Sequence, residues 1–110
     1  MTIHITRIDN RFPTTGQITP QDIAEIKSKG FSGIVCARPD NEERGRPSFD
    51  EIARAAKESG LPIVHIPVSG MLSQGQVIRF EEAMARIQGP VLGYCRSGAR
   101  AGSLYTTLRR

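Results

Sequence analysis

Residues 89–100 read GPVLGYCRSGAR, and this stretch decides the fold. Residues 90–94 form a short, almost continuous apolar run, which is typical of a strand covered on both faces in a parallel sheet. The chain then passes through Cys95 and Gly98 and is expected to form a helix over about 100–109. A buried strand followed by a short loop and a helix is the repeating unit of α/β domains.

Three more segments carry the signals that start and stop helices. Thr19 precedes a helix predicted over about 20–29, and Ser48 and Ser73 begin capping boxes for two later helices. Glycine, which adopts the left-handed conformation at helix ends without strain, is expected to end each of the three. The stop positions are Gly30, Gly60 and Gly89.

Apolar runs lie between these helices at residues 33–37 and 62–68. They are rich in β-branched residues and do not alternate with polar ones, which favours strands of a parallel sheet. Residues 4–8 and 11–15 are expected to form short edge strands. The sequence therefore predicts a single three-layer α/β domain over residues 1–110, with a mostly parallel central sheet and helices on both faces.

The composition favours an ordinary globular protein. The chain has 110 residues, of which 38% are hydrophobic and 24% charged, and its formal net charge is +4. The excess of cations is small and the arginines are scattered, so nucleic acid is not an expected partner. No apolar run approaches the roughly 20 residues that cross a bilayer, and no secretory leader pattern is visible. We therefore expect a cytoplasmic protein without a membrane partner.

Cys95 follows the predicted strand at the place where open parallel sheets bind their ligands. A loop through Gly98 into a helix presents backbone N–H groups to an anion, and the helix N-terminus adds partial positive charge. Arg96 and Arg100 add two fixed charges. This setting favours the thiolate and suits attack on a phosphoryl group or a sulfane sulfur. The alternative is an inert, buried cysteine. The residues expected to bind the anion are Arg96, Ser97, Gly98, Ala99 and Arg100.

Four residues on other elements are weaker candidates. Cys36 lies within an apolar strand and is expected to be a small core residue, with a resolving thiol as the alternative. His65 is expected to support the core or the site rather than to transfer a proton. Asp40 is either a general acid or a turn carboxylate, and Arg38, which begins the same loop, is a further candidate to bind the anion. The sequence predicts no metal or other cofactor, because no ligand pair has metal-binding spacing.

Four motifs together resemble a known family. They are GQI at 16–18, CARPD at 36–40, HIPV at 65–68 and the stretch 89–100. Over nearly the whole chain they resemble the phosphatase-like, or sulfurtransferase-like, domain of beta-lactamase hydrolase-like proteins. The resemblance implies a bacterial protein with a fold like that of protein tyrosine and dual-specificity phosphatases. It also implies a link to a metallo-beta-lactamase-like protein.

The resemblance also assigns roles. Cys95 takes the position of the nucleophile and Arg100 that of the anion-binding arginine. Two features depart from the tyrosine phosphatase pattern. Arg100 is five residues after Cys95 rather than six, which resembles the loop of rhodaneses, and residues 68–71 contain no acidic residue where dual-specificity phosphatases carry their general acid. Loss of a general acid can slow a phosphatase by about 10²–10⁴-fold.

These departures favour a rhodanese-like sulfurtransferase, in which a Cys95 persulfide carries sulfur from thiosulfate or a persulfide donor to a thiol. The alternative is a phosphatase that forms a cysteinyl-phosphate from a phosphate ester, with Asp40 as its acid. A second alternative is a non-catalytic module that binds anions. In each case the ligand is a small anion.

Overall fold

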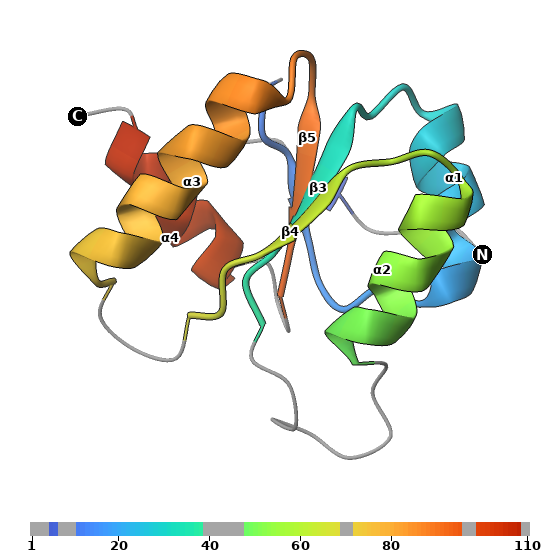
Figure 1. Ribbon diagram of the computed structural model, residues 1–110, viewed down its shortest axis with the longest axis horizontal. Coiled ribbons are helices and arrows are strands. Elements are labelled where there is room, and N and C mark those ends of the chain that lie inside the picture. Colours follow the sequence, from blue (N-terminus) through green and yellow to red (C-terminus); the bar gives the residue numbers. More distant parts are fainter. Residues whose placement is uncertain (1–4, 7–10, 39–47, 69–71, 96–98, 109–110) are drawn as a thin grey trace.

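The computed structural model describes residues 5–6, 11–38, 48–68, 72–95 and 99–108, and for residues 6, 99–100 and 106–108 it describes the backbone alone. Two short strands come first, and helices then alternate with three longer strands (Figure 1). The elements are β1 (Ile5–Thr6), β2 (Thr14–Thr15), η1 (Pro20–Asp22), α1 (Ile23–Ser28), β3 (Gly33–Cys36), α2 (Phe49–Glu58), β4 (Ile63–His65), α3 (Gln74–Arg86), β5 (Val91–Tyr94) and α4 (Ala99–Leu108).

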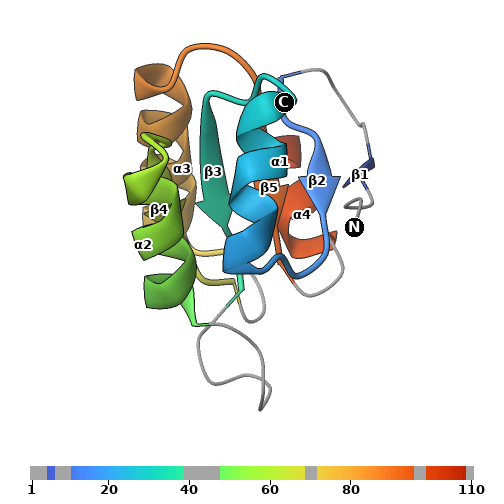
Figure 2. The same ribbon diagram turned by 90° about the vertical axis from the view of Figure 1, so that its right-hand side faces the viewer.

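The strands form one five-stranded sheet in the order β1-β2-β5-β3-β4. Strands β2, β5, β3 and β4 are parallel, and β1 is antiparallel at one edge. Helices α1 and α2 cover one face, and α3 and α4 cover the other (Figures 1 and 2). The predicted three-layer α/β fold with a mostly parallel sheet is therefore confirmed.

Local capping explains where the helices begin. The Ser48 hydroxyl oxygen accepts a hydrogen bond from the Glu51 N–H at the start of α2. At the start of α3, the Ser73 hydroxyl accepts from the Gln76 N–H at 3.1 Å, and the Gln76 side chain accepts from the Ser73 N–H at 2.6 Å. These contacts satisfy N–H groups that the first helical turn leaves without partners. The predicted helices are thus confirmed to within a residue or two at most ends.

The strands are somewhat shorter than predicted. The apolar run 62–68 forms a strand only over Ile63–His65, because Pro62 and Pro67 have no N–H to donate to a sheet. The pairing nevertheless continues past the strand, since the N–H groups of Ile66 and Val68 donate to the carbonyls of Cys36 and Ala37. The edge strand predicted at 11–15 forms only over Thr14–Thr15. Of the strand predicted at 4–8, the described residues are Ile5–Thr6, which form β1.

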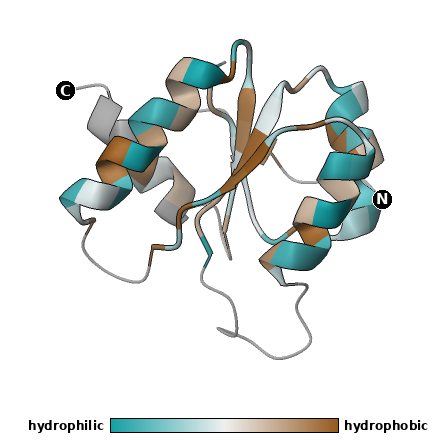
Figure 3. Cartoon of the chain, viewed as in Figure 1, coloured by the Kyte–Doolittle hydropathy of each residue, from teal (hydrophilic) through white to brown (hydrophobic). Residues whose placement is uncertain are grey.

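The sheet separates two hydrophobic cores. The α3/α4 core includes Phe12, Val35, Ala37, Phe80 and Cys95, and the α1/α2 core includes Ile18, Ile34, Cys36, Ile52 and Tyr94. Apolar residues gather on the strands, and hydrophilic residues cover much of the outer surface of α1, α2 and α3 (Figure 3). Consecutive residues of β3 and β5 therefore point into opposite cores, as alternation along a strand requires.

Phe12 and Gly93 hold α4 close to the sheet. The Phe12 ring packs edge-to-face on Phe80 at 5.1 Å and stacks on Tyr105 of α4 at 5.3 Å. A Cβ at Gly93 would lie 2.3 Å from Phe12 Cζ and 3.0 Å from Ala101 Cβ. Only glycine fits there, so the absence of a side chain lets the first turns of α4 approach β5.

The helices that the structure describes include none long and apolar enough to cross a membrane.

Candidate active site

The carboxyl ends of the four parallel strands meet at one edge of the sheet. Cys95 directly follows β5 there, and its N–H donates to the Thr15 carbonyl of β2 at 3.4 Å. On the other side, the Tyr94 carbonyl accepts from the Ala37 N–H, beyond β3, at 2.8 Å. The backbone around Cys95 is therefore fixed between two neighbouring strands, at the edge where α/β proteins bind ligands.

Helix α4 begins at Ala99, four residues after Cys95. Since Gly93 brings Ala101 against β5, the N-terminus of α4 lies next to the strand end that carries the cysteine. The first N–H groups of a helix lack partners within it and carry partial positive charge, which favours an anion. The backbone thus provides the strand, short connection and helix start that the sequence predicted for an oxyanion site.

The side chain of Cys95 belongs to the α3/α4 core and is fully buried. Burial alone would also fit the inert cysteine that the sequence left as an alternative, because unmodified cysteine is often a core residue. The placement of Cys95 directly after β5 and four residues before the start of α4 distinguishes it from a cysteine in the middle of a core strand.

Cys36 lies at the end of the adjacent strand but on the opposite face. It pairs in register with Tyr94 and belongs to the α1/α2 core. Its side chain is 2% exposed, and Sγ lies 3.5 Å from the Arg38 carbonyl oxygen. The structure thus supports the core interpretation. A resolving thiol would have to reach Cys95 through the sheet, so this alternative is not supported.

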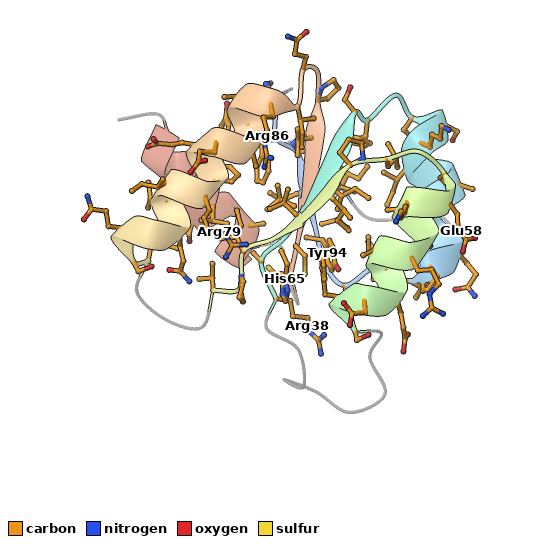
Figure 4. All side chains as sticks on the ribbon, viewed as in Figure 1. Arg38, Glu58, His65, Arg79, Arg86 and Tyr94 are labelled. Atoms are coloured by element: carbon orange, nitrogen blue, oxygen red, sulfur yellow. The ribbon has the colours of Figure 1, made fainter. Side chains whose placement is uncertain are left out.

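His65 makes contacts from the end of β4. Its Nε2 lies 2.9 Å from the Arg38 carbonyl oxygen, and its ring stacks on Phe49, with centroids 4.4 Å apart. The His65 carbonyl in turn accepts a hydrogen bond from Arg79 of α3. Figure 4 shows His65 and Arg38 together at the lower end of the strands, near Tyr94. These contacts support the predicted role of His65 as a supporting residue.

Arg38 is 3% exposed. It follows Ala37, whose N–H is bonded to Tyr94, so its backbone lies beside the point where the chain leaves β5. The structure therefore brings Arg38 and Cys95 to the same part of the sheet edge, on adjacent parallel strands.

Several predicted site residues lie outside the described residues. They are Asp40, Arg96, Ser97 and Gly98. Ala99 and Arg100 are the first two residues of α4, and only their backbone is described. Within the part of the chain that the structure describes, no group of three or more His, Cys, Asp or Glu residues could hold a metal ion.

Two residues near Cys95, Thr15 and Gln17, were not predicted from the sequence as parts of the site. Thr15 supplies the carbonyl that accepts from the Cys95 N–H. Gln17, two residues further along, donates from Nε2 to the Ile18 carbonyl at 2.7 Å, and its Oε1 is buried without a hydrogen bond in the structure. Both follow from the pairing of β2 with β5, which no local sequence signal indicates. Only the GQI motif at 16–18 pointed to this segment.

Two cavities lined by described residues lie away from Cys95. One, of about 300 Å³, lies between η1 and α2 and is lined by Pro20, Glu51, Arg54, Ala55 and Glu58. The other, also about 300 Å³, lies between β4 and the end of α3 and is lined by Pro62, Ile63, Val64, Arg86 and Ile87. Neither contains a nucleophilic side chain, so the sheet edge at Cys95 is the better candidate for chemistry.

The fold and this edge define a phosphatase-like α/β domain. The chain matches the phosphatase-like domain of beta-lactamase hydrolase-like proteins over residues 5–109, and it belongs to that family. A beta-lactamase hydrolase-like protein of Agrobacterium fabrum is 37% identical over 100 residues, which cover 90% of this chain and 23% of the relative. One from Xylella fastidiosa is 33% identical, covering 94% and 24%. The chain thus spans about a quarter of the length of these relatives.

Solved structures support the same assignment. A putative phosphatase from Neisseria meningitidis superposes with a TM-score of 0.83 and is 31% identical, covering 96% of this chain and 75% of its own. The active form of Tk-PTP has a TM-score of 0.64 at 24% identity, covering 91% and 67%. The catalytic core of a PP-IP phosphatase from S. cerevisiae reaches 0.69 at 15%, covering 96% and 64%. The latter two show the fold alone.

These comparisons confirm the resemblance to the beta-lactamase hydrolase-like family and the phosphatase-like fold. They also reverse the order of the functions predicted from sequence. The matched family is phosphatase-like and the Neisseria structure is that of a putative phosphatase, which supports the phosphatase alternative and not the favoured sulfurtransferase.

Proposed function

We propose that this domain is a cysteine-dependent phosphatase that hydrolyses a small, accessible phosphate ester through a cysteinyl-phosphate on Cys95. The observation that carries the proposal is the position of Cys95, which directly follows β5 and precedes the N-terminus of α4 by four residues. The matched family is phosphatase-like, and the Neisseria protein of 31% identity shares the fold.

The reaction has two steps. The Cys95 thiolate attacks phosphorus and forms an S–P bond, while the P–O bond to the alcohol or phenol breaks and the leaving oxygen takes up a proton. Water then attacks phosphorus, the S–P bond breaks, and inorganic phosphate and the thiolate are released. Backbone N–H groups of residues 96–100 would bind the phosphoryl oxygens, and Arg96 and Arg100 would balance their negative charge.

Asp40 is the candidate acid for the first step, since residues 68–71 contain no carboxylate. Without an acid, alkyl esters should react much more slowly than esters of acidic phenols, because a phenoxide leaves more readily without a proton. The Asp40→Asn variant should therefore slow alkyl esters more than aryl esters. Equal rates for the variant and the parent protein on both esters would exclude Asp40 as the acid.

Sulfur transfer is the second candidate, and one observation favours it. Arg100 is five residues after Cys95 rather than the six of tyrosine phosphatases, which shortens the loop around the anion. In this reaction, the Cys95 thiolate would attack the sulfane sulfur of thiosulfate, form a persulfide and release sulfite. A later thiol would then take up that sulfur. Addition of one sulfur to Cys95 by thiosulfate, with no hydrolysis of phosphate esters, would place this function above the phosphatase.

Steady-state hydrolysis of 4-nitrophenyl phosphate tests the proposal. The parent protein and the Arg86→Ala control, which removes an exposed charge far from Cys95, should hydrolyse the ester at equal rates. The Arg100→Ala variant should lose about 10²–10³-fold in kcat/KM, because one preorganised group that stabilises transition-state charge is worth that much. Equal activity of Arg100→Ala and the control would contradict the proposed role of Arg100. Absence of hydrolysis by the parent protein, and of phosphate binding, would contradict the proposed function.

A further inference from the structure

His65 connects three elements around the sheet edge. It is the last residue of β4, and its ring nitrogen Nε2 contacts the carbonyl oxygen of Arg38, which follows β3. Its ring also stacks on Phe49, the first residue of α2. A carbonyl oxygen can only accept a hydrogen bond, so the Nε2 that lies 2.9 Å from the Arg38 oxygen carries a hydrogen. Nε2–H is present in both the Nε2-protonated neutral ring and the charged ring, so this contact does not depend on the charge of His65.

The orientation of the ring is fixed from two sides. The rings of His65 and Phe49 are nearly parallel, with an angle of 11° between their planes. The backbone of His65 is paired in register with Cys36, and its carbonyl accepts from Arg79. Because the backbone and the ring of His65 are both held in place, its Nε2–H group points at the Arg38 carbonyl oxygen. His65 is therefore a rigid support for whatever it contacts, and it contacts the backbone of Arg38.

Arg38 is a buried cation, and its chain neighbour Ala37 is hydrogen-bonded to Tyr94, the residue before Cys95. Arginine carries a planar guanidinium whose N–H groups suit an oxyanion, and Arg38 is 3% exposed. Because the Ala37 N–H is bonded to the Tyr94 carbonyl, a shift of Arg38 changes the distance from its charge to the start of residues 95–100. Charge acts more strongly where little water screens it, so small shifts of a buried cation change the binding of an anion.

We propose that His65 is a positioning residue that acts through Arg38. Its Nε2–H holds the Arg38 carbonyl, and this contact sets the distance between the Arg38 charge and the phosphate bound next to Cys95. The inference rests on the proposed phosphatase function and adds Arg38 and His65 to its anion site. It predicts that the loss of the Nε2–H weakens phosphate binding and that this effect disappears when the Arg38 charge is absent.

Four variants and a control test this proposal. His65→Phe keeps a flat ring on Phe49 but has no N–H. His65→Gln keeps an N–H donor at a similar distance from the backbone. Arg38→Ala removes the charge, and the double variant His65→Phe with Arg38→Ala gives the coupling between the two residues. Arg86→Ala controls for the loss of one positive charge from the whole domain.

The measured quantity is the inhibition constant of inorganic phosphate against hydrolysis of 4-nitrophenyl phosphate, with a urea unfolding curve for each variant. His65→Phe should raise this constant about fivefold to tenfold, the effect of losing one hydrogen bond. KM should rise by the same factor and kcat should change little, because the charge binds substrate and transition state alike. His65→Gln should restore most of the binding, and Arg86→Ala should have no effect.

Three results would overturn the inference alone. The first is an inhibition constant of phosphate that is unchanged in His65→Phe. The second is an equal loss of phosphate binding from His65→Phe in the presence and in the absence of the Arg38 charge. The third is a His65→Gln variant that unfolds like the parent protein but does not recover phosphate binding. A parent protein that neither hydrolyses the ester nor binds phosphate would overturn the proposed function and this inference together.

Discussion

The ends of β3 and β5 are neighbours in the sheet, but the chain continues differently after each of them. Cys36 and Cys95 are both almost fully buried, and Cys36 pairs in register with the residue before Cys95. Cys36 points into the α1/α2 core, and the next helix on its side begins only at Phe49. Cys95 points into the α3/α4 core, and α4 begins four residues later. The comparison teaches that a cysteine at a strand end becomes a candidate nucleophile through a short connection to a helix N-terminus.

The largest expected effect separates the two cysteines by activity. Cys95→Ser should lower kcat/KM for 4-nitrophenyl phosphate by about 10³-fold or more, because removal of a nucleophile removes its covalent path. The matched Cys36→Ser variant should stay within about twofold of the parent protein. The comparison fails if the two serine variants lose activity to a similar extent.

The next effect concerns packing against a glycine in each of the two strands β3 and β5. Gly93→Ala should lower the free energy of unfolding by about 1–3 kcal/mol, because its Cβ meets the Phe12 ring, which Phe80 and Tyr105 hold in place. The matched Gly33→Ala variant on β3 should cost less, since the nearest atoms are methyl carbons of Ile87 at 2.9 Å. Urea unfolding measures both. A larger loss of unfolding free energy for Gly33→Ala than for Gly93→Ala would mean that the packing around Gly93 is not the tighter of the two.

A smaller effect is expected from shortening the core cysteine. Cys36→Ala should lower the free energy of unfolding by about 1 kcal/mol, as expected for loss of one buried heavy atom. The hydrolysis rate should remain that of the parent protein, because Cys36 lies on the far face of the sheet. A stable Cys36→Ala variant that had lost activity would assign Cys36 a role at the site.

The last prediction is that oxidation forms no disulfide bond between Cys36 and Cys95. The side chains of Cys36 and Cys95 point to opposite faces of the sheet, so their sulfur atoms cannot reach the separation of a disulfide without a rearranged backbone. After mild treatment with hydrogen peroxide, mass spectrometry of the unreduced protein should show no bond between Cys36 and Cys95. Detection of this bond in the folded protein would restore the resolving role of Cys36.

Much of the fold could be predicted because its signals are local. Ser48 and Ser73 cap helices through residues three positions away, and glycines at positive φ, such as Gly60, end them. The strand order β1-β2-β5-β3-β4 could not be predicted, because pairing joins residues far apart in sequence. The strands are almost continuously apolar, so no alternation of polar and apolar residues indicated that the two cysteines face opposite cores.

The site could be predicted only in part. The strand, Cys95 and the following helix start lie within one short stretch, so the candidate nucleophile could be found without the fold. The contacts of His65 with Arg38 and Phe49 join three elements, and no local pattern indicates them. The choice between phosphate and sulfur depended on the family, because a thiolate beside an anion site suits both reactions.

The most direct test of the central claim is to identify the atom that carries the phosphoryl group during turnover. The parent protein and the Cys36→Ser variant are mixed with an excess of a radiolabelled aryl phosphate, quenched by rapid denaturation and digested, and the labelled peptide is sequenced by mass spectrometry. The account predicts one phosphoryl group on Cys95 in both proteins and none in Cys95→Ser. Hydrolysis without label on Cys95, or label on Cys36 or another residue, would contradict it.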